Sequence, residues 1–166
     1  IAHPMETMQR ASHALAIGPD GSPASRSEDD DGNLLLIEPI DADGLDELLA
    51  AEGTVVGVVV LAELHRRDAE ALATRYDVPI YLPARVATLK HSLDAPVTVF
   101  EETLPGTSLR AIPVLHGVPW CEAVLYDEST GTLVATELLV TSERTTGWGE
   151  RLSVGPYARL QPPRAA

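Results

Sequence analysis

The sequence predicts an α/β protein, and three observations indicate that class. Residues 55–62 form an almost unbroken aliphatic run, which is typical of a strand buried on both faces of a sheet. Apolar residues at helical spacing follow between residues 69 and 76, and a second short strand is predicted at residues 78–82. From residue 96 onward, closely spaced strand patterns replace this alternation. The strand–loop–helix–strand unit of residues 55–83 is therefore the centre of the predicted fold.

Two strands and a helix are predicted before this unit. Residues 12–17 and 33–39 have strand patterns, and the segment 18–32 between them is rich in glycine, proline, serine and acids. Such a composition predicts a mobile acidic loop rather than a cation site. Residues 41–53 have the pattern of a helix, with Asp41 or Asp43 as the cap at its start and Gly53 at its end.

The second half of the chain predicts one more helix and then mainly strands. The helix covers residues 84–91, and residues 128–131 form a turn. Strands are predicted at residues 97–100, 109–115, 122–126 and 132–136. We interpret residues 143–166 as an irregular tail, and residues 1–4 as an expression remnant because the chain starts at Ile1. Residues 1–166 are expected to form a single domain.

The charge of the chain limits its partners. A formal net charge of -13, with Lys90 as the only lysine, argues against nucleic acid or an anionic membrane as a partner. Such acid-rich chains resemble the proteins of extreme halophiles, because at molar salt the Debye length is only about 3 Å and like charges repel little. The alternative is an ordinary acidic protein from a GC-rich bacterium.

Cysteine usage and hydropathy predict a cytoplasmic protein. Cys121 is the only cysteine, so no disulfide forms within the chain, as fits a reducing compartment. No run of about 18 apolar residues is present for a membrane span, and no signal peptide is recognisable.

The order of the central elements resembles the metallo-β-lactamase family. In that family an apolar strand is followed by His-x-His-x-Asp-His, a helix and a strand ending in proline. Aligned without gaps, the signature falls on Glu63, His65, Arg67 and Asp68. The resemblance covers about residues 14–139. It implies an αββα sandwich of two sheets between helices, and the chain either lacks the family's C-terminal layer or stops before it.

The resemblance also implies where a metal would bind. Family members hold two metals, commonly zinc, and use a metal-bound hydroxide as nucleophile. Residues at or near the matching positions are candidate metal ligands. They are Glu63, His65, Asp68, His116 and Glu137, although His116 lies one residue from the family's ligand position.

Other positions depart from the family or line its site. Arg67 stands where the family has a ligand aspartate; a guanidinium has no acceptor and repels a dication. It is expected to pair with Glu63, Asp68 or Glu137. Glu38 matches an aspartate that lies under the metal site in the family, and the alternative is a solvent-facing acid at a strand end. Trp120 either lines the cleft or covers the core.

Two functions remain open on these residues. The first is a divergent, non-hydrolytic binding or structural module that keeps the fold but has a degenerate metal site. The second is an atypical hydrolase of an ester, thioester or phosphodiester, with one zinc, manganese or iron ion held by Glu63, His65, His116 and Glu137. No catalytic residue or small-molecule ligand is assigned. A homodimer is expected to cover the sheet edge that a missing layer would expose.

Overall fold

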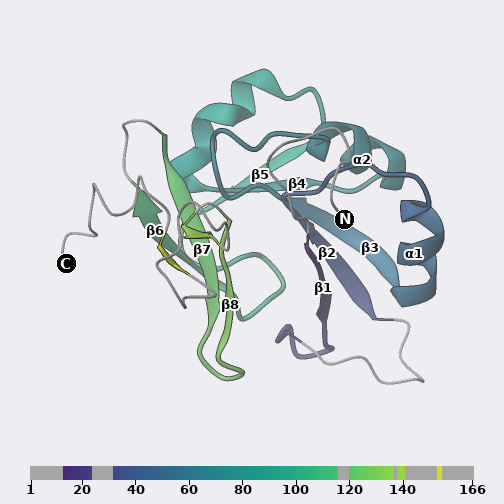
Figure 1. Ribbon diagram of the computed structural model, residues 1–166, viewed down its shortest axis with the longest axis horizontal. Helices are drawn as coiled ribbons and strands as arrows, with labels where there is room; N and C mark the ends of the chain where they lie inside the picture. Colours follow the sequence, from purple (N-terminus) through teal and green to yellow (C-terminus); the bar gives the residue numbers. More distant parts are fainter. Residues whose placement is uncertain (1–12, 24–31, 116–119, 137, 141–152, 155–166) are drawn as a thin grey trace.

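The computed structural model of the chain describes residues 13–23, 32–115, 120–136, 138–140 and 153–154. Within these residues, a five-stranded and a three-stranded sheet face each other, and helices cover the outer face of the larger sheet (Figure 1). The layers are therefore helices, large sheet and small sheet. This arrangement confirms the predicted α/β class.

The large sheet has its strands in the order of the sequence. Strand β1 is antiparallel to β2, and the remaining pairs are parallel. The aliphatic run predicted as the central strand becomes β3 and its continuation, with Val58 to Ala62 fully buried. The strands are β1 (His13–Ile17), β2 (Asn33–Ile37), β3 (Thr54–Val59), β4 (Ile80–Pro83) and β5 (Val97–Phe100).

Three helices pack on one face of this sheet. They are α1 (Leu45–Glu52), α2 (Ala69–Tyr76) and the 3₁₀ helix η1 (Ala84–Ser92). Leu49, Leu72 and Val86, one from each helix, join side chains of β2, β3 and β4 in one buried cluster. The helical spacing read from the sequence therefore identifies the face of α2 that packs on the sheet. No helix in the described part of the chain is long and apolar enough to span a membrane.

The predicted cap of α1 is partly wrong. Gly53 does end the helix, but Gly44 begins it and makes no side-chain cap hydrogen bond. The carboxylate of Asp41 instead forms an ion pair with Arg75 of α2. This charge-assisted pair between Arg75 of α2 and the segment before α1 takes the aspartate away from the helix end where the sequence placed it.

The small sheet consists of β6 (Arg110–Leu115), β7 (Glu122–Asp127) and β8 (Thr132–Val134), all antiparallel. Strands β9 (Leu139–Val140) and β10 (Ser153–Val154) pair with each other and form a separate two-stranded sheet. A second buried cluster, which includes Ile37, Leu61 and Leu125, fills the space between the two sheets. The strands predicted in this half of the chain are thus confirmed, and the predicted tail lies outside the described residues except for its part in β10.

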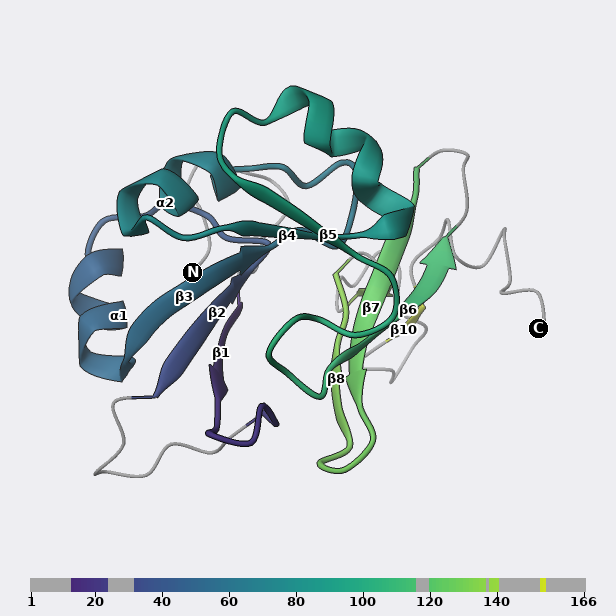
Figure 2. The same ribbon diagram turned by 180° about the vertical axis from the view of Figure 1, so that it is seen from behind.

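The two sheets are joined by backbone hydrogen bonds near the end of β3. The N–H of Ala123 donates to the carbonyl oxygen of Leu61 at 2.9 Å, and the N–H of Glu63 donates to that of Cys121 at 3.1 Å. The chain beyond β3 therefore pairs with the start of β7. Figure 2 shows the two sheets from behind. We call this pairing of residues 61–63 with 121–123 the sheet junction.

A second contact between the sheets lies at the opposite end, where the segment 18–23 forms a turn. Gly21 is buried there, and its carbonyl oxygen accepts the N–H of Ser108 at 2.9 Å. The hydroxyl of Ser108 donates to the carboxylate of Asp127. This part of the predicted loop is packed against the segment before β6. Residues 24–31 lie outside the described residues, and the mobility of residues 18–32 stays a prediction.

Candidate functional site

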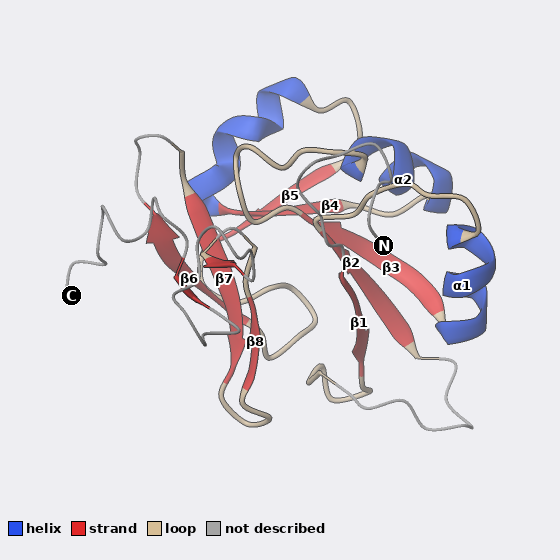
Figure 3. Cartoon of the chain, viewed as in Figure 1, coloured by secondary structure: helices blue, strands red, loops and turns tan. Residues whose placement is uncertain are grey.

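The described candidate residues gather at the carboxyl ends of β2 and β3. Glu38 directly follows β2, and residues 60–68 form the connection from β3 to α2, drawn as a loop in Figure 3. Ligands of open α/β sheets usually bind at such an edge. The topology therefore supports the location that the sequence predicted for the site.

Glu38 is a buried carboxyl group at the centre of this region. Its side chain is 1% exposed, and its Oε1 accepts the N–H groups of Leu61 at 2.5 Å and Ala62 at 3.0 Å. Burial raises the pKa of Glu38 to about 8, although these two N–H groups and the charge of Arg67 act in the opposite direction. The alternative of a solvent-facing acid is therefore wrong, and the place of Glu38 under a metal site stays a prediction.

His65 lies against this carboxyl group. Its Nδ1 is 3.5 Å from Oε2 of Glu38, and its side chain is 13% exposed. The distance is longer than an ordinary hydrogen bond but within the range of an ion pair.

Arg67 holds Glu38 through its backbone. Its Nη1 donates to the carbonyl oxygen of Glu38 at 3.1 Å. Both residues have positive φ, 52° for Glu38 and 40° for Arg67, a region that non-glycine residues adopt at a cost of about 1–3 kcal/mol. Two strained residues in direct contact are typical of a functional or formerly functional site.

The carboxylate of Glu63 is used in the sheet junction. Its Oε1 accepts the hydroxyl of Thr88 in η1, and its Oε2 accepts the N–H of Cys121, both at 2.7 Å. Glu63 thus connects the loop after β3 to η1 and to the segment before β7. In this geometry each of its oxygens already accepts a hydrogen bond from the protein.

Asp68 also has a protein partner. Its Oδ2 accepts the N–H of Asp41 at 2.9 Å, so it fixes the segment between β2 and α1 beside the start of α2. Glu63 and Asp68 thus bind other groups, and the expected pairing of Arg67 with Glu63, Asp68 or Glu137 stays a prediction. The remaining expected partner of Arg67, Glu137, lies outside the described residues, as does His116.

Trp120 is buried, and its indole N–H donates to Glu122 at 3.2 Å. It packs in a cluster with Ala62 and Leu115, so of the two expected roles the structure supports the core one. Glu122 is fully buried and also accepts the hydroxyl of Thr136 at 2.7 Å. The sequence analysis missed Glu122; an acid inside an otherwise apolar strand was the available signal.

His13 is the second residue that the sequence analysis missed. It begins β1 and pairs with Ile37, the residue before Glu38. Desolvation lowers the pKa of His13, and nearby positive charge, including that of Arg67, adds to the effect. His13 is exposed and lies on the strand that pairs with β2, which Glu38 follows.

The described residues do not fit a metal ion. Among them, no three His, Cys, Asp or Glu side chains come together in a group that could hold a metal. The oxygens of Glu63 point to Thr88 and Cys121 rather than toward His65. A metal site built with His116 and Glu137 remains a prediction.

Comparison with known proteins gives a weak structural similarity. No protein-family model matches the chain, and no curated protein matches its sequence. Among solved structures, the crystal structure of BLEG-1 B3 metallo-beta-lactamase is similar, with a TM-score of 0.48 and 17% sequence identity over 74% of this chain and 70% of that chain. A TM-score below 0.5 does not establish a shared fold, and it gives no residue of this chain a role.

Proposed function

We propose that this chain is a divergent metallo-β-lactamase-like domain in which the residues at the metal-ligand positions form hydrogen bonds within the chain instead of binding a metal. It would act as a binding or structural module rather than as a hydrolase. The observation that carries this proposal is that the residues at the signature positions are hydrogen-bonded to other parts of the chain. Glu63 connects η1 and the segment before β7, Asp68 holds the N–H of Asp41, and Arg67 holds the carbonyl oxygen of Glu38.

Electrostatics supports the same proposal. A dication bound beside His65 would lie near the guanidinium of Arg67, and like charges a few ångströms apart repel strongly in a partly buried site. The carboxyl group beneath it gives little compensation at neutral pH, because burial raises the pKa of Glu38 to about 8. The region therefore lacks the concentration of negative charge that a metal site needs.

One observation favours the second candidate, an atypical hydrolase with a single zinc, manganese or iron ion. The imidazole of His65 faces the carboxyl group of Glu38, and metal-binding histidines commonly have their second nitrogen held by such a group. This function requires Glu63 to release its present partners. It also requires His116 and Glu137 to supply the remaining ligands.

Bound metal separates the two functions. The protein would be purified without chelator in molar potassium chloride and analysed by elemental mass spectrometry, with circular dichroism to confirm folding. We expect far less than one equivalent of zinc, manganese or iron. About one equivalent that is lost in the variant Glu63→Ala/His65→Ala, but kept in the exposed control Asp43→Ala/His91→Ala, would overturn the proposal and justify assays on esters, thioesters and phosphodiesters.

We also propose that the protein works in the cytoplasm of a halophile, without nucleic acid or membrane as partner, and forms a homodimer. The net charge of -13 supports the first part, since salt screens such a charge. Strand β6 lies at an edge of the small sheet. It is unsuited to pairing with a second copy of the chain, because Pro113 lacks an N–H. Light scattering in low and molar potassium chloride tests the dimer, and a monomer in both would refute it.

A further inference from the structure

A groove lies at the opposite edge of the large sheet from the candidate site. It runs between α2 and the segments that lead into β4 and β5, with a volume of about 420 Å³ open to solvent. Its apolar surface comes from Ala95 and the rings of Pro79 and Pro96, while Ala73 also lines the groove but is only 1% exposed. None of the candidate residues discussed above lines the groove, although Glu70 follows Asp68 by two positions at the start of α2.

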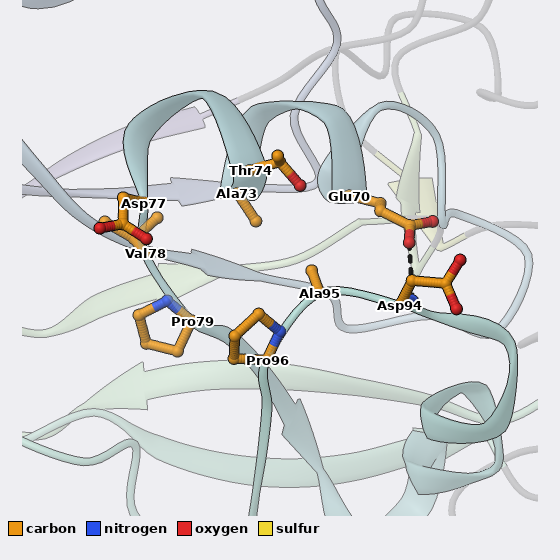
Figure 4. A pocket seen from close by; sticks show the side chains of 9 residues that line it. All are labelled: Glu70, Ala73, Thr74, Asp77, Val78, Pro79, Asp94, Ala95 and Pro96. Carbon is orange, nitrogen blue, oxygen red and sulfur yellow. Dashed lines mark hydrogen bonds between the residues drawn. The ribbon is translucent and has the colours of Figure 1, made fainter.

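Carboxylates stand at both ends of this groove. Figure 4 shows Asp77 at one end and Glu70 with Asp94 at the other, while α2 forms one wall and the two prolines lie opposite it. The carboxyl end of α2 adds the negative end of its helix dipole beside Asp77. Arg75, in the last turn of α2, does not neutralise the groove, since its guanidinium is bound to Asp41 and Asp46.

The backbone around the groove offers few donors. The N–H groups of Asp77 and Val78 return to carbonyl oxygens of α2, and the N–H of Asp94 donates to Glu70 at 2.6 Å. Proline has no N–H, so Pro79 and Pro96 contribute none. These five positions present acceptors and apolar surface, and an anionic ligand finds no backbone donor at them.

We propose that this groove binds an extended segment of a partner protein that carries arginine or lysine side chains. The aliphatic stems of such side chains can lie on the proline and alanine surface while their charged ends reach the carboxylates. The groove thus matches the segment in charge and in apolar character together. Binding is expected to weaken with salt, because the carboxylates are exposed.

The probe is a short fluorescein-labelled peptide with two arginines, titrated with the full chain and followed by fluorescence anisotropy. We expect the double variant Glu70→Gln/Asp77→Asn to weaken binding about tenfold, or about 1.4 kcal/mol. Glutamine at position 70 can still accept the N–H of Asp94, so the groove keeps its shape. The matched control Asp43→Asn/Glu128→Gln removes the same charge at exposed positions outside the groove, and we expect it to bind as the wild type does.

Three results would overturn the proposal. The wild type could fail to bind the peptide. The two double variants could weaken binding equally, in which case general attraction to an acidic surface explains it. The same peptide with citrulline in place of arginine could bind equally well, in which case the groove does not recognise charge. None of these three peptide-binding results depends on the metal content of the protein. They therefore leave the function proposed above, which metal content tests, unaffected.

Discussion

The two contacts between the sheets are both built on a buried carboxyl group, but the two groups differ in their protonation. Glu38, near the sheet junction, accepts two backbone N–H groups, and burial raises its pKa to about 8. Asp127, at the other end, accepts the hydroxyls of Ser108 and Ser129 and the N–H and hydroxyl of Thr130. These hydrogen bonds hold the pKa of Asp127 well below its usual range.

The difference shows that burial alone does not determine the charge of a carboxyl group. Both groups are about 1% exposed. The hydroxyls of Ser108 and Ser129 and the N–H and hydroxyl of Thr130 donate to the two oxygens of Asp127 and stabilise its anion. Desolvation is therefore outweighed at Asp127 and dominant at Glu38. Three experiments can break or sharpen this comparison.

The largest effect is expected from removing the Glu38 side chain. Glu38→Ala leaves the N–H groups of Leu61 and Ala62 buried without their acceptor, which should lower the free energy of unfolding by about 3 kcal/mol. Glu38→Gln should lose only about 1 kcal/mol, because its amide oxygen can accept the same two N–H groups. Urea unfolding followed by circular dichroism gives both values. Equal losses in the two variants would show that these hydrogen bonds contribute little.

The contact at the other end is tested through Gly21. A Cβ at this position would lie 2.8 Å from the carbonyl oxygen of Gly106, and φ is +82°. Gly21→Ala should therefore lower the free energy of unfolding by about 2 kcal/mol, through strain and displacement of the neighbouring loop. Gly131→Ala is the matched control, since its φ is +69° but no atom lies within 4 Å of the added Cβ. It should lose about 1 kcal/mol through backbone strain alone; if it lost as much as Gly21→Ala, the close approach would not matter.

The third test is the pair of pH slopes, which should have opposite signs. Glu38 has an unfolded pKa near 4.5 and a folded pKa of about 8, so between these values the folded state binds the extra proton. The stability of the wild type relative to Glu38→Gln should then fall as pH rises through this range, by at most about 1.4 kcal/mol per pH unit.

For Asp127 the folded pKa lies below the unfolded value near 3.8. Its contribution is therefore present above about pH 4 and is lost as pH falls below it. The stability of the wild type relative to Asp127→Asn should decrease only on acidification. Unfolding curves from about pH 3 to 9 for the wild type and the two variants measure both slopes. Slopes of the same sign would mean that one of the two carboxyl groups has been assigned the wrong protonation.

Much of the fold could be predicted from local sequence patterns. The aliphatic run of β3, the helical spacing of α2 and the short strands after residue 96 all have periodicities that tertiary contacts do not change. The α1 cap could not be predicted, because Arg75 draws the carboxylate of Asp41 away. That competitor comes from a helix about 30 residues further along the chain.

The loop that the sequence marked as the candidate site does follow β3, but its role as a binding site stays a prediction. The position of the loop after β3 could be predicted from the sequence, because polar residues at the end of a buried strand must reach a sheet edge. The partners of its side chains did not follow, since Thr88, Cys121 and Asp41 are brought there by separate elements. Glu122 and His13 were missed for the same reason: their importance depends on what the fold places beside them.

The sheet junction also has a consequence for the order of folding events. It joins residues about sixty positions apart, so the chain between them must close into a loop before the junction can form, at an entropic penalty that grows slowly with loop length. The hairpin β7–β8 and the β3–α2–β4 unit need only local contacts and can form earlier. We therefore expect the amides of Glu63 and Ala123 to become protected from hydrogen exchange last during refolding and to report on the complete fold.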